Sequence, residues 1–246
     1  MNDFIAKLNV FIETMKGPVW QKNLAIGLTN TVKIAVLGLV IGIILGTLIA
    51  VIKVAPKYKR VMRILDKICA VYVAIFRGTP MVVQLLLAYY CILPAFGVTG
   101  VNAVSVGIEV FGMNSGAYVS EIMRGGIGAV DVGQLEAARA LGLSYPVAML
   151  KVVVPQAIKN VIPTIGNEFI TLIKETSVLS FVTVYDLYTV FESMVGLTYE
   201  PMVPYLAMAL IYIVLVLIIT FLIKIVENVL AKSDRNRKAK GGKAKA

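Results

Sequence analysis

The sequence predicts an all-α integral membrane protein with five transmembrane helices, on the basis of its composition and of several long uncharged segments. Of its 246 residues, 59% are hydrophobic and only 15% are charged, and the mean hydropathy is +0.85. Soluble domains average about 45–50% apolar and about 25% charged residues. The chain has two cysteines and no histidine, which excludes Cys/His zinc sites and catalytic triads that use histidine. We therefore expect neither a metal site nor an enzyme active site.

Five segments are apolar enough to cross about 30 Å of hydrocarbon, which takes about 20 helical residues. The first, 34–52, contains nineteen residues without a charge. The 31 uncharged residues 78–108 are too long for one crossing, and Pro94, Gly97 and Gly100 favour a hairpin of two. The amphipathic stretch 60–76 is expected to lie along the membrane, which keeps Arg77 at the inner interface. The expected spans are 34–52, 79–94, 101–123, 152–174 and 202–223.

The positive residues of the connecting segments alternate along the chain. The loop 53–67 has six Lys and Arg, the segment 124–159 four and the tail from residue 224 eight, whereas 94–103 and 183–204 have none. Cytoplasmic loops carry the excess of Lys and Arg. The bias predicts an outside N-terminus and a cytoplasmic C-terminus, although Lys7, Lys16 and Lys22 oppose it.

The domain organisation is expected to be simple. Residues 1–23 form an amphipathic N-terminal segment in the outer interface, because Phe4, Leu8, Phe11 and Met15 recur at helical spacing. Residues 24–228 form the transmembrane domain, and residues 229–246 form a basic cytoplasmic tail. We expect the part of this tail from Ser233 to Ala246 to be disordered beside anionic lipid, and nucleic acid is not an expected partner.

The expected cytoplasmic segment 133–146 has the chemistry of a short helix followed by a sharp bend. Good helix formers precede Gly142, which can take the left-handed conformation that ends a helix. Ser144 and Pro146 suit the start of the next helix. From helix chemistry alone, this segment is either an ordinary interfacial hairpin or a surface on which another protein docks.

Four motifs in order make the chain similar to membrane subunits of ABC importers, in particular the polar amino acid permeases. Glu136-Ala137-Ala138, then Gly142, then Val152-x-Val154-Pro155 resembles the EAA loop of these subunits, with Val in place of the usual Ile and Leu. The other three motifs are Phe76-Arg77-Gly78-Thr79-Pro80, Asn114-Ser115-Gly116-Ala117-Tyr118 and Gly166-Asn167-Glu168-Phe169-Ile170. The resemblance implies a type I ABC importer transmembrane domain with a cytoplasmic EAA coupling helix.

The resemblance also implies partners and a mechanism. The coupling helix, with Glu136, Ala137, Ala138 and Gly142, would dock in a cleft of an ATP-binding subunit. Other expected partners are an extracytoplasmic amino acid-binding protein and a second copy of this chain or a sister permease, in a bacterial inner membrane. The sequence has no phosphate-binding loop of the form G-x-x-x-x-G-K-[ST]. No cofactor is therefore expected in this chain, and a partner subunit would bind the ATP.

A polar stripe on the fourth expected span indicates the substrate path. A charged residue at the bilayer centre costs about 2.5–3.5 kcal/mol, so it usually faces a cavity or a partner. Glu168, about 20 Å along the helix from Pro155, would bind the ammonium of an amino acid or, alternatively, form a structural ion pair. The stripe comprises Gln156, Asn160, Thr164, Asn167, Thr171 and Lys174, with Glu168 and Glu175 beside it, and Asn114, Tyr118 and Glu121 are candidates for the facing wall.

Two further alternatives concern packing and mechanism. Gly38, Gly42 and Gly46 form a face of small residues that suits close helix contact, either within the subunit or between subunits. A secondary transporter or channel without an ATPase is the alternative function. Such transporters commonly contain internal repeats, and no repeat relates residues 24–123 to residues 124–228.

Overall fold

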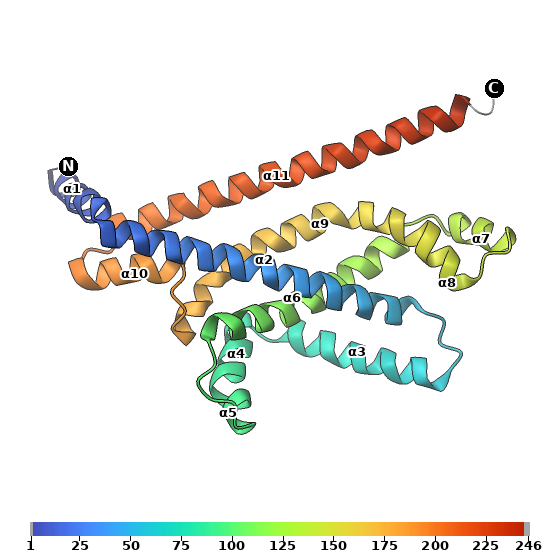
Figure 1. The fold of residues 1–246 in the computed structure, drawn as a ribbon, viewed down its shortest axis with the longest axis horizontal. Coiled ribbons are helices and arrows are strands. Elements are labelled where there is room, and N and C mark those ends of the chain that lie inside the picture. Colours follow the sequence, from blue (N-terminus) through green and yellow to red (C-terminus); the bar gives the residue numbers. More distant parts are fainter. Residues whose placement is uncertain (1, 244–246) are drawn as a thin grey trace.

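The computed structural model describes the backbone of residues 2–243 and the side chains of residues 4–230, and in this range every regular element is a helix (Figure 1). Two elements, η1 and η2, are π-helical and η3 is a 3₁₀-helix. The elements are α1 (Asn2–Lys16), α2 (Pro18–Val54), α3 (Arg60–Gly78), α4 (Met81–Leu86), η1 (Leu87–Ile92), α5 (Leu93–Ala95), α6 (Ala103–Gly128), α7 (Val132–Ala140), α8 (Tyr145–Ala148), η2 (Met149–Val153), α9 (Val154–Glu175), η3 (Thr176–Val182), α10 (Leu187–Thr198) and α11 (Met202–Lys243).

All five expected spans are helical, in α2, α4–α5, α6, α9 and α11. By length and composition alone, α2 and α11 can each cross a membrane, and two bent helix pairs raise the number to as many as four. One pair joins Arg60–Gly78 to Met81–Ala95, and the other joins Tyr145–Val182 to Leu187–Thr198. The α6 segment, which completes the expected five, carries Glu109, Glu121 and Arg124.

The bundle has two ends, which we name the α1 end and the α7 end after the helices found there (Figure 1). The loop after α2 and the hairpin of α7 and α8 both lie at the α7 end, and α11 points in the same direction. The three segments rich in Lys and Arg therefore share one end of the molecule, as their alternation along the sequence predicts.

The α2–α6 pair forms the closest seam of the bundle. A Cβ on Gly38, Gly42 or Gly46 would lie 2.9, 2.6 or 2.7 Å from an atom of Phe111, Ser115 or Val119 of α6, respectively. Each partner lies 73 positions after its glycine (38 to 111, 42 to 115, 46 to 119), so the two helices run parallel in a fixed register. The glycine face thus packs within the subunit, which was the first of the two alternatives.

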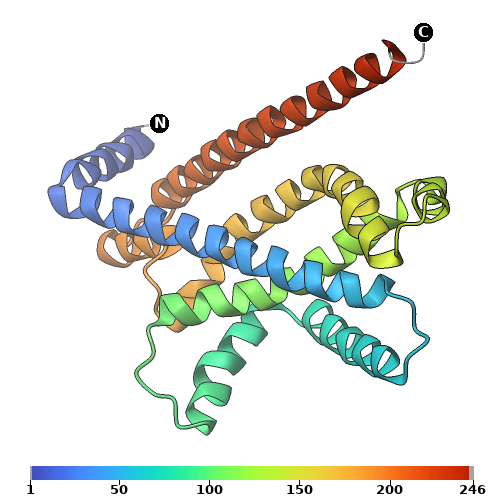
Figure 2. The same ribbon diagram turned by 45° about the vertical axis from the view of Figure 1, so that its right-hand side comes forward.

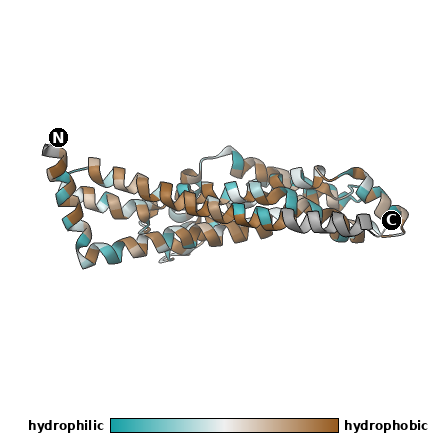
Figure 3. Cartoon of the chain, turned by 90° about the horizontal axis from the view of Figure 1, so that it is seen from above, coloured by the Kyte–Doolittle hydropathy of each residue, from teal (hydrophilic) through white to brown (hydrophobic). Residues whose placement is uncertain are grey.

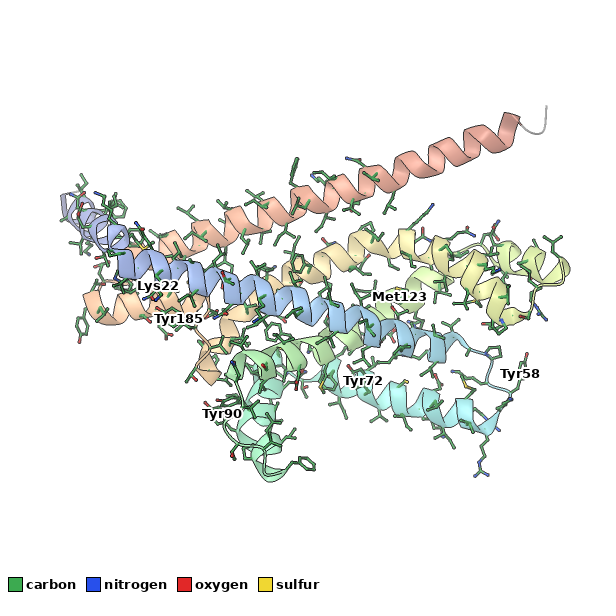
Figure 4. The ribbon with its side chains drawn as sticks, in the orientation of Figure 1. Lys22, Tyr58, Tyr72, Tyr90, Met123 and Tyr185 are labelled. Atoms are coloured by element: carbon green, nitrogen blue, oxygen red, sulfur yellow. The ribbon has the colours of Figure 1, made fainter. Side chains whose placement is uncertain are left out.

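The expected orientation of 60–76 is wrong. Figure 1 shows α3 running alongside α2, and the chain then bends by 109° into α4–α5. The buried Cys69 and Val73 pack with Ala117 of α6, and the Tyr72 hydroxyl donates to the Met113 carbonyl (Figure 4). These contacts hold α3 in the bundle. Arg77 therefore lies at the C-terminal end of a helix that runs along the bundle, and not at the inner membrane interface.

The α1 end contains a helix that the sequence did not predict. The expected loop 183–204 contains α10, where Asp186 accepts hydrogen bonds from the backbone N–H and hydroxyl of Thr189 at 2.9 and 2.6 Å. The amphipathic α1 lies across this end of the bundle (Figure 3). Lys7 forms an ion pair of 3.2 Å with Glu200, and Phe11 packs against the buried residues of α10.

The C-terminal segment also differs from the expectation. The backbone of α11 stays helical to Lys243, whereas a disordered tail was expected from Ser233. Residues 244–246 lie outside the described residues. In Figure 2 the far half of α11 separates from the rest of the bundle, and only 6% of its most apolar stretch is buried. Its apolar surface is available to lipid or to another chain.

Candidate functional site

The hairpin of α7 and α8 has the helix-bend-helix geometry that the sequence predicts. Asp131 begins α7, and its carboxylate accepts a hydrogen bond of 2.8 Å from the Gly133 N–H. Gly142 ends it with a φ of +83°. The Gly142 N–H donates to the Arg139 carbonyl at 3.0 Å, and the Leu143 N–H donates to the Ala138 carbonyl at 3.2 Å. This pattern is a Schellman motif, which satisfies the last carbonyls of the helix.

The residues of the EAA motif do not share one surface. Glu136 and Ala137 are exposed, but Ala138 is only 5% exposed. The two adjacent alanines therefore face different surroundings, because consecutive helical residues point about 100° apart. Leu141 is 84% exposed beside the bend. The exposed surface of the hairpin thus includes the Glu136 carboxylate, the small side chains of Ala137 and Ala140, and the apolar side chain of Leu141.

The polar stripe of α9 lies on an open face of the helix. Asn160, Thr164, Asn167, Thr171 and Lys174 are all exposed, whereas Ala157, Val161, Gly166, Leu172 and Ile173 of the same helix are buried. Gln156 is half-buried, and its amide donates to the Val152 carbonyl at 2.9 Å. The Thr171 hydroxyl donates to the Asn167 carbonyl at 3.1 Å, but the exposed amides of Asn160 and Asn167 would be unsatisfied in lipid. This face needs water, a ligand or another subunit.

Glu168 is turned from the open face toward α6. The side chain is half-buried and faces Ser115. The Ser115 hydroxyl is buried and makes no hydrogen bond of standard geometry with any described residue. Since Ser115 packs on Gly42, the carboxylate lies at the level of the middle of the uncharged segment 34–52. No ion pair of Glu168 is present among the described side chains.

Asn114 is placed differently from its expected position on the facing wall. It is 5% exposed, and its Nδ2 donates to Gln84 Oε1 at 2.9 Å and to the Phe76 carbonyl at 3.3 Å. Gln84 Nε2 in turn donates to the Phe76 and Thr79 carbonyls at 2.8 and 3.0 Å. These bonds fix the α3–α4 bend. Gln84, the one amide in the otherwise apolar stretch 81–96, was the overlooked signal.

The remaining candidates of α6 divide into two groups. Tyr118 is 37% exposed, and the Arg77 guanidinium lies 5.4 Å from the centre of its ring. Glu121 instead pairs with Lys53 of α2 and, at 2.8 Å, with Arg124. Glu121 therefore belongs to an ion-pair network between α2 and α6. Glu109 is exposed on the first half of α6.

Comparison with known families identifies the chain. The model of the family described as "Binding-protein-dependent transport system inner membrane component" matches residues 38–232. The chain belongs to this family. As a permease of this family it is a transport subunit of an ABC importer and not an enzyme, since a partner subunit hydrolyses ATP. Membership excludes the alternative of a secondary transporter or channel without an ATPase.

Relatives cover most of the permease. The arginine transport system permease protein ArtQ of Bacillus subtilis is 39% identical over 208 residues, which are 85% of this chain and 92% of ArtQ. The putative glutamine transport system permease protein GlnP of Rickettsia prowazekii is 38% identical over 82% of this chain and 89% of its own length. The nopaline transport system permease protein NocM of Agrobacterium fabrum is 31% identical over 80% of this chain and 83% of NocM.

Solved structures match the fold of the permease. A crystal structure of an amino acid ABC transporter with histidines has a TM-score of 0.78 at 37% identity, covering 89% of this chain and 97% of the solved one. An inward-facing structure of the MetNI methionine ABC transporter has a TM-score of 0.73 at 17% identity, covering 87% and 98%. The expected fold, an all-α type I ABC importer transmembrane domain, is confirmed, and the number of helices is roughly consistent with the five expected spans.

Proposed function

We propose that this permease forms the translocation path for a polar L-amino acid and that the open face of α9 lines this path. The observation that carries the proposal is the row of exposed polar side chains on a membrane helix. Lipid cannot satisfy these groups, whereas a water-filled path between two permease subunits can. The amino acid substrates named for several relatives support the same class of cargo.

Glu168 is the proposed partner of the substrate ammonium. The carboxylate lies beside the open face, at mid-depth, with Ser115 as its polar neighbour, and no cation of residues 4–230 pairs with it. The absence of an ion pair among the described side chains favours the binding role over the structural alternative. Asn160, Thr164, Asn167 and Thr171 would line the path before and after Glu168, and Tyr118 would lie on its α6 side.

The α7–α8 hairpin is the proposed docking site of the ATP-binding subunit. Glu136 would make a polar contact there, Ala137 would allow close approach, and Gly142 would fix the bend. Ala138 would act from inside, because its small side chain lets α7 pack closely on the protein beneath. ATP bound in the partner would close two ATP-binding subunits and draw the hairpins together, so that the helices behind them rock between inward-facing and outward-facing states.

The remaining assignments follow from this coupling. The α7 end would face the cytoplasm and the α1 end the outside of a bacterial inner membrane, with the N-terminus outside. An extracytoplasmic amino acid-binding protein would deliver the substrate at the α1 end. A second copy of this chain or a sister permease would complete the path against the open face of α9.

The test is transport by the Glu168→Gln variant. The complex of permease and ATP-binding subunit is reconstituted in vesicles with its binding protein, and uptake of labelled L-arginine and L-glutamine is measured beside complex yield. Loss of the charge should lower uptake at least tenfold while yield is unchanged, because a charge-assisted hydrogen bond contributes about 1.5–3 kcal/mol. Normal uptake would contradict the substrate role of Glu168. A collapse in yield would instead favour a structural ion pair with another chain.

A further inference from the structure

Arg77 is an exposed cation far along α3, and it pairs with no carboxylate among the side chains that the structure describes. It lies in the last turn of α3, 17 residues after Arg60, which is about 25 Å along the helix. Among the residues whose side chains the structure describes, no ion pair reaches its guanidinium. Charged residues inside a membrane usually face a water-filled cavity or a ligand. Arg77 therefore requires an explanation that packing within the chain does not supply.

The other cations of this region have such an explanation. Lys53 pairs with Glu121, and Lys57 pairs with Asp66 at 2.6 Å. Arg60, Arg63 and Lys67 share an exposed face of α3 with Arg77, but they lie in its first two turns near the α7 end, where water and headgroups are close. Arg77 is the one cation of α3 that lies far from this end.

The Arg77 side chain contacts one aromatic ring, and its backbone lies beside a hydrogen-bonded bend. It lies 5.4 Å from the centre of the Tyr118 ring, whose face attracts a cation. Its backbone belongs to the α3–α4 bend, where the Phe76 carbonyl accepts from both Gln84 and Asn114. Transporter binding sites are often formed by interrupted helices near the bilayer midplane. Arg77 thus projects from the fixed end of an interrupted helix.

A short stretch of α6 connects this cation to Glu168. Ser115 faces the Glu168 carboxylate, and Tyr118 lies under the Arg77 guanidinium. Residues three apart on a helix are neighbours and differ by about 4.5 Å in height. One anionic and one cationic side chain, contributed by α9 and α3, therefore flank less than one turn of α6. An α-amino acid carries its ammonium and its carboxylate on the same carbon, so it presents matching charges at short separation.

We propose that Arg77 binds the α-carboxylate of the transported amino acid and that Tyr118 positions its guanidinium. The inference rests on the proposed function of Glu168 as the partner of the ammonium. The planar guanidinium matches the two oxygens of a carboxylate, and no described carboxylate occupies it in the free permease. The same pair would select α-amino acids over amines and over amides that lack the negative charge.

The experiment compares free acids with their α-carboxamides. Equilibrium binding of L-arginine, L-argininamide, L-glutamine and L-glutaminamide is measured on the purified permease–ATPase complex without binding protein, so that only the permease selects. The native complex should bind each acid more tightly than its amide. In Arg77→Gln, the affinity for the acids should fall 10- to 100-fold, and the affinity for the amides should change less than threefold. The ratio of acid affinity to amide affinity should therefore approach one. Arg77→Lys should keep a reduced preference, because it keeps the charge without the planar fork.

Arg63→Gln is the matched control, since Arg63 is exposed on the same face of α3 but near its start; this variant should keep the native ratio. Tyr118→Leu should lower the ratio more than Tyr118→Phe, which keeps the ring.

An unchanged ratio in Arg77→Gln, with native complex yield, overturns the inference and leaves the proposed function intact. A loss of complex yield in both Arg77 variants overturns it in favour of an ion pair with another subunit. A native complex that binds neither acid overturns the proposed function as well.

Discussion

The seam between α2 and α6 and the open face of α9 lie in one bundle but have opposite properties. In the seam, three glycines bring two parallel helices into a register without room for a methyl group. On α9, five polar side chains remain exposed and make few contacts. The seam places Ser115 and Tyr118 at fixed heights, whereas the open face leaves space beside them. The difference supports the proposal that this chain builds one rigid wall of the path and leaves the other wall to a partner.

The largest expected effect follows from closing the seam with a larger side chain. A Cβ on Gly46 would lie 2.7 Å from Val119 Cβ and 2.8 Å from the Gly116 carbonyl oxygen. Because backbone atoms cannot move aside cheaply, Gly46→Val should lower stability by about 3 kcal/mol. Thermal unfolding and complex yield measure this. Gly125→Val, in the last turn of α6 where a Cβ meets nothing within 4 Å, is the control, and equal yields of the two variants would contradict the rigid seam.

The second effect concerns function without stability. The double variant Thr164→Val and Asn167→Leu makes part of the open face of α9 apolar. Since these side chains pack little within the chain, complex yield should be unchanged, but uptake should fall about tenfold, or about 1.4 kcal/mol in the barrier. Uptake in reconstituted vesicles measures it. The control is Ile158→Leu, at an exposed apolar position of α9. If uptake falls equally in this control, or if the double variant transports normally, the open face of α9 does not line the translocation path.

The third effect tests a glycine needed for its backbone conformation instead of its size. Gly142 has a φ of +83°, and a Cβ there meets nothing within 4 Å. A β-branched residue in the left-handed region costs about 1–2 kcal/mol, so Gly142→Val should lower ATP hydrolysis stimulated by the binding protein several-fold. Gly142→Asn should keep more of it, because Asn tolerates this conformation. Equal activity of both variants would show that the bend does not transmit the coupling.

The smallest expected effect is on stability and concerns the cap of α10, the helix on which α2 packs beyond the seam. Asp186 is fully buried and caps α10 through Thr189. Asp186→Ala should cost about 1 kcal/mol, the usual value of a helix cap. Asp186→Asn should cost less, since Asn is also a good cap and its second polar atom would replace a carboxylate oxygen that has no partner among the described residues. Thermal unfolding of both variants measures the difference, and equal losses would contradict a capping role.

Local chemistry predicted the positions of the expected spans and the bend at Gly142, because uncharged runs and a helix-ending glycine act over a few residues. It did not predict the course of α3. An amphipathic helix with a 3.6-residue period fits two environments equally well: the membrane surface, and the edge of a bundle with one face of the helix toward lipid. The choice depends on Tyr72 and Met113, which lie 41 residues apart in sequence. Contacts of that range leave no pattern in a local stretch.

The candidate site shows the same limit. Helical spacing groups Asn114 with Tyr118 on α6, but it cannot say which neighbour each of them meets. In the structure, Asn114 meets the α3–α4 bend and Glu168 meets Ser115. Gln84 was overlooked because it is a single amide in an apolar stretch, and Arg77 was placed at the inner interface because its helix was expected to lie along the membrane. α10 was missed although Asp186 and Thr189 have the spacing of a helix cap.

The π-helical η2 gives a physical reason for the fixed length of the EAA signature. Five residues, Met149–Val153, wind more widely than an α-helix and join the α7–α8 hairpin to α9. Each residue of a helix turns the chain by about 100°, so inserting or deleting one residue between Gly142 and Val152 would rotate the polar side of α9 away from its present direction. Nine residues separate these two positions. Their number therefore sets an angle as well as a length, and substitutions in this stretch should be far better tolerated than insertions or deletions.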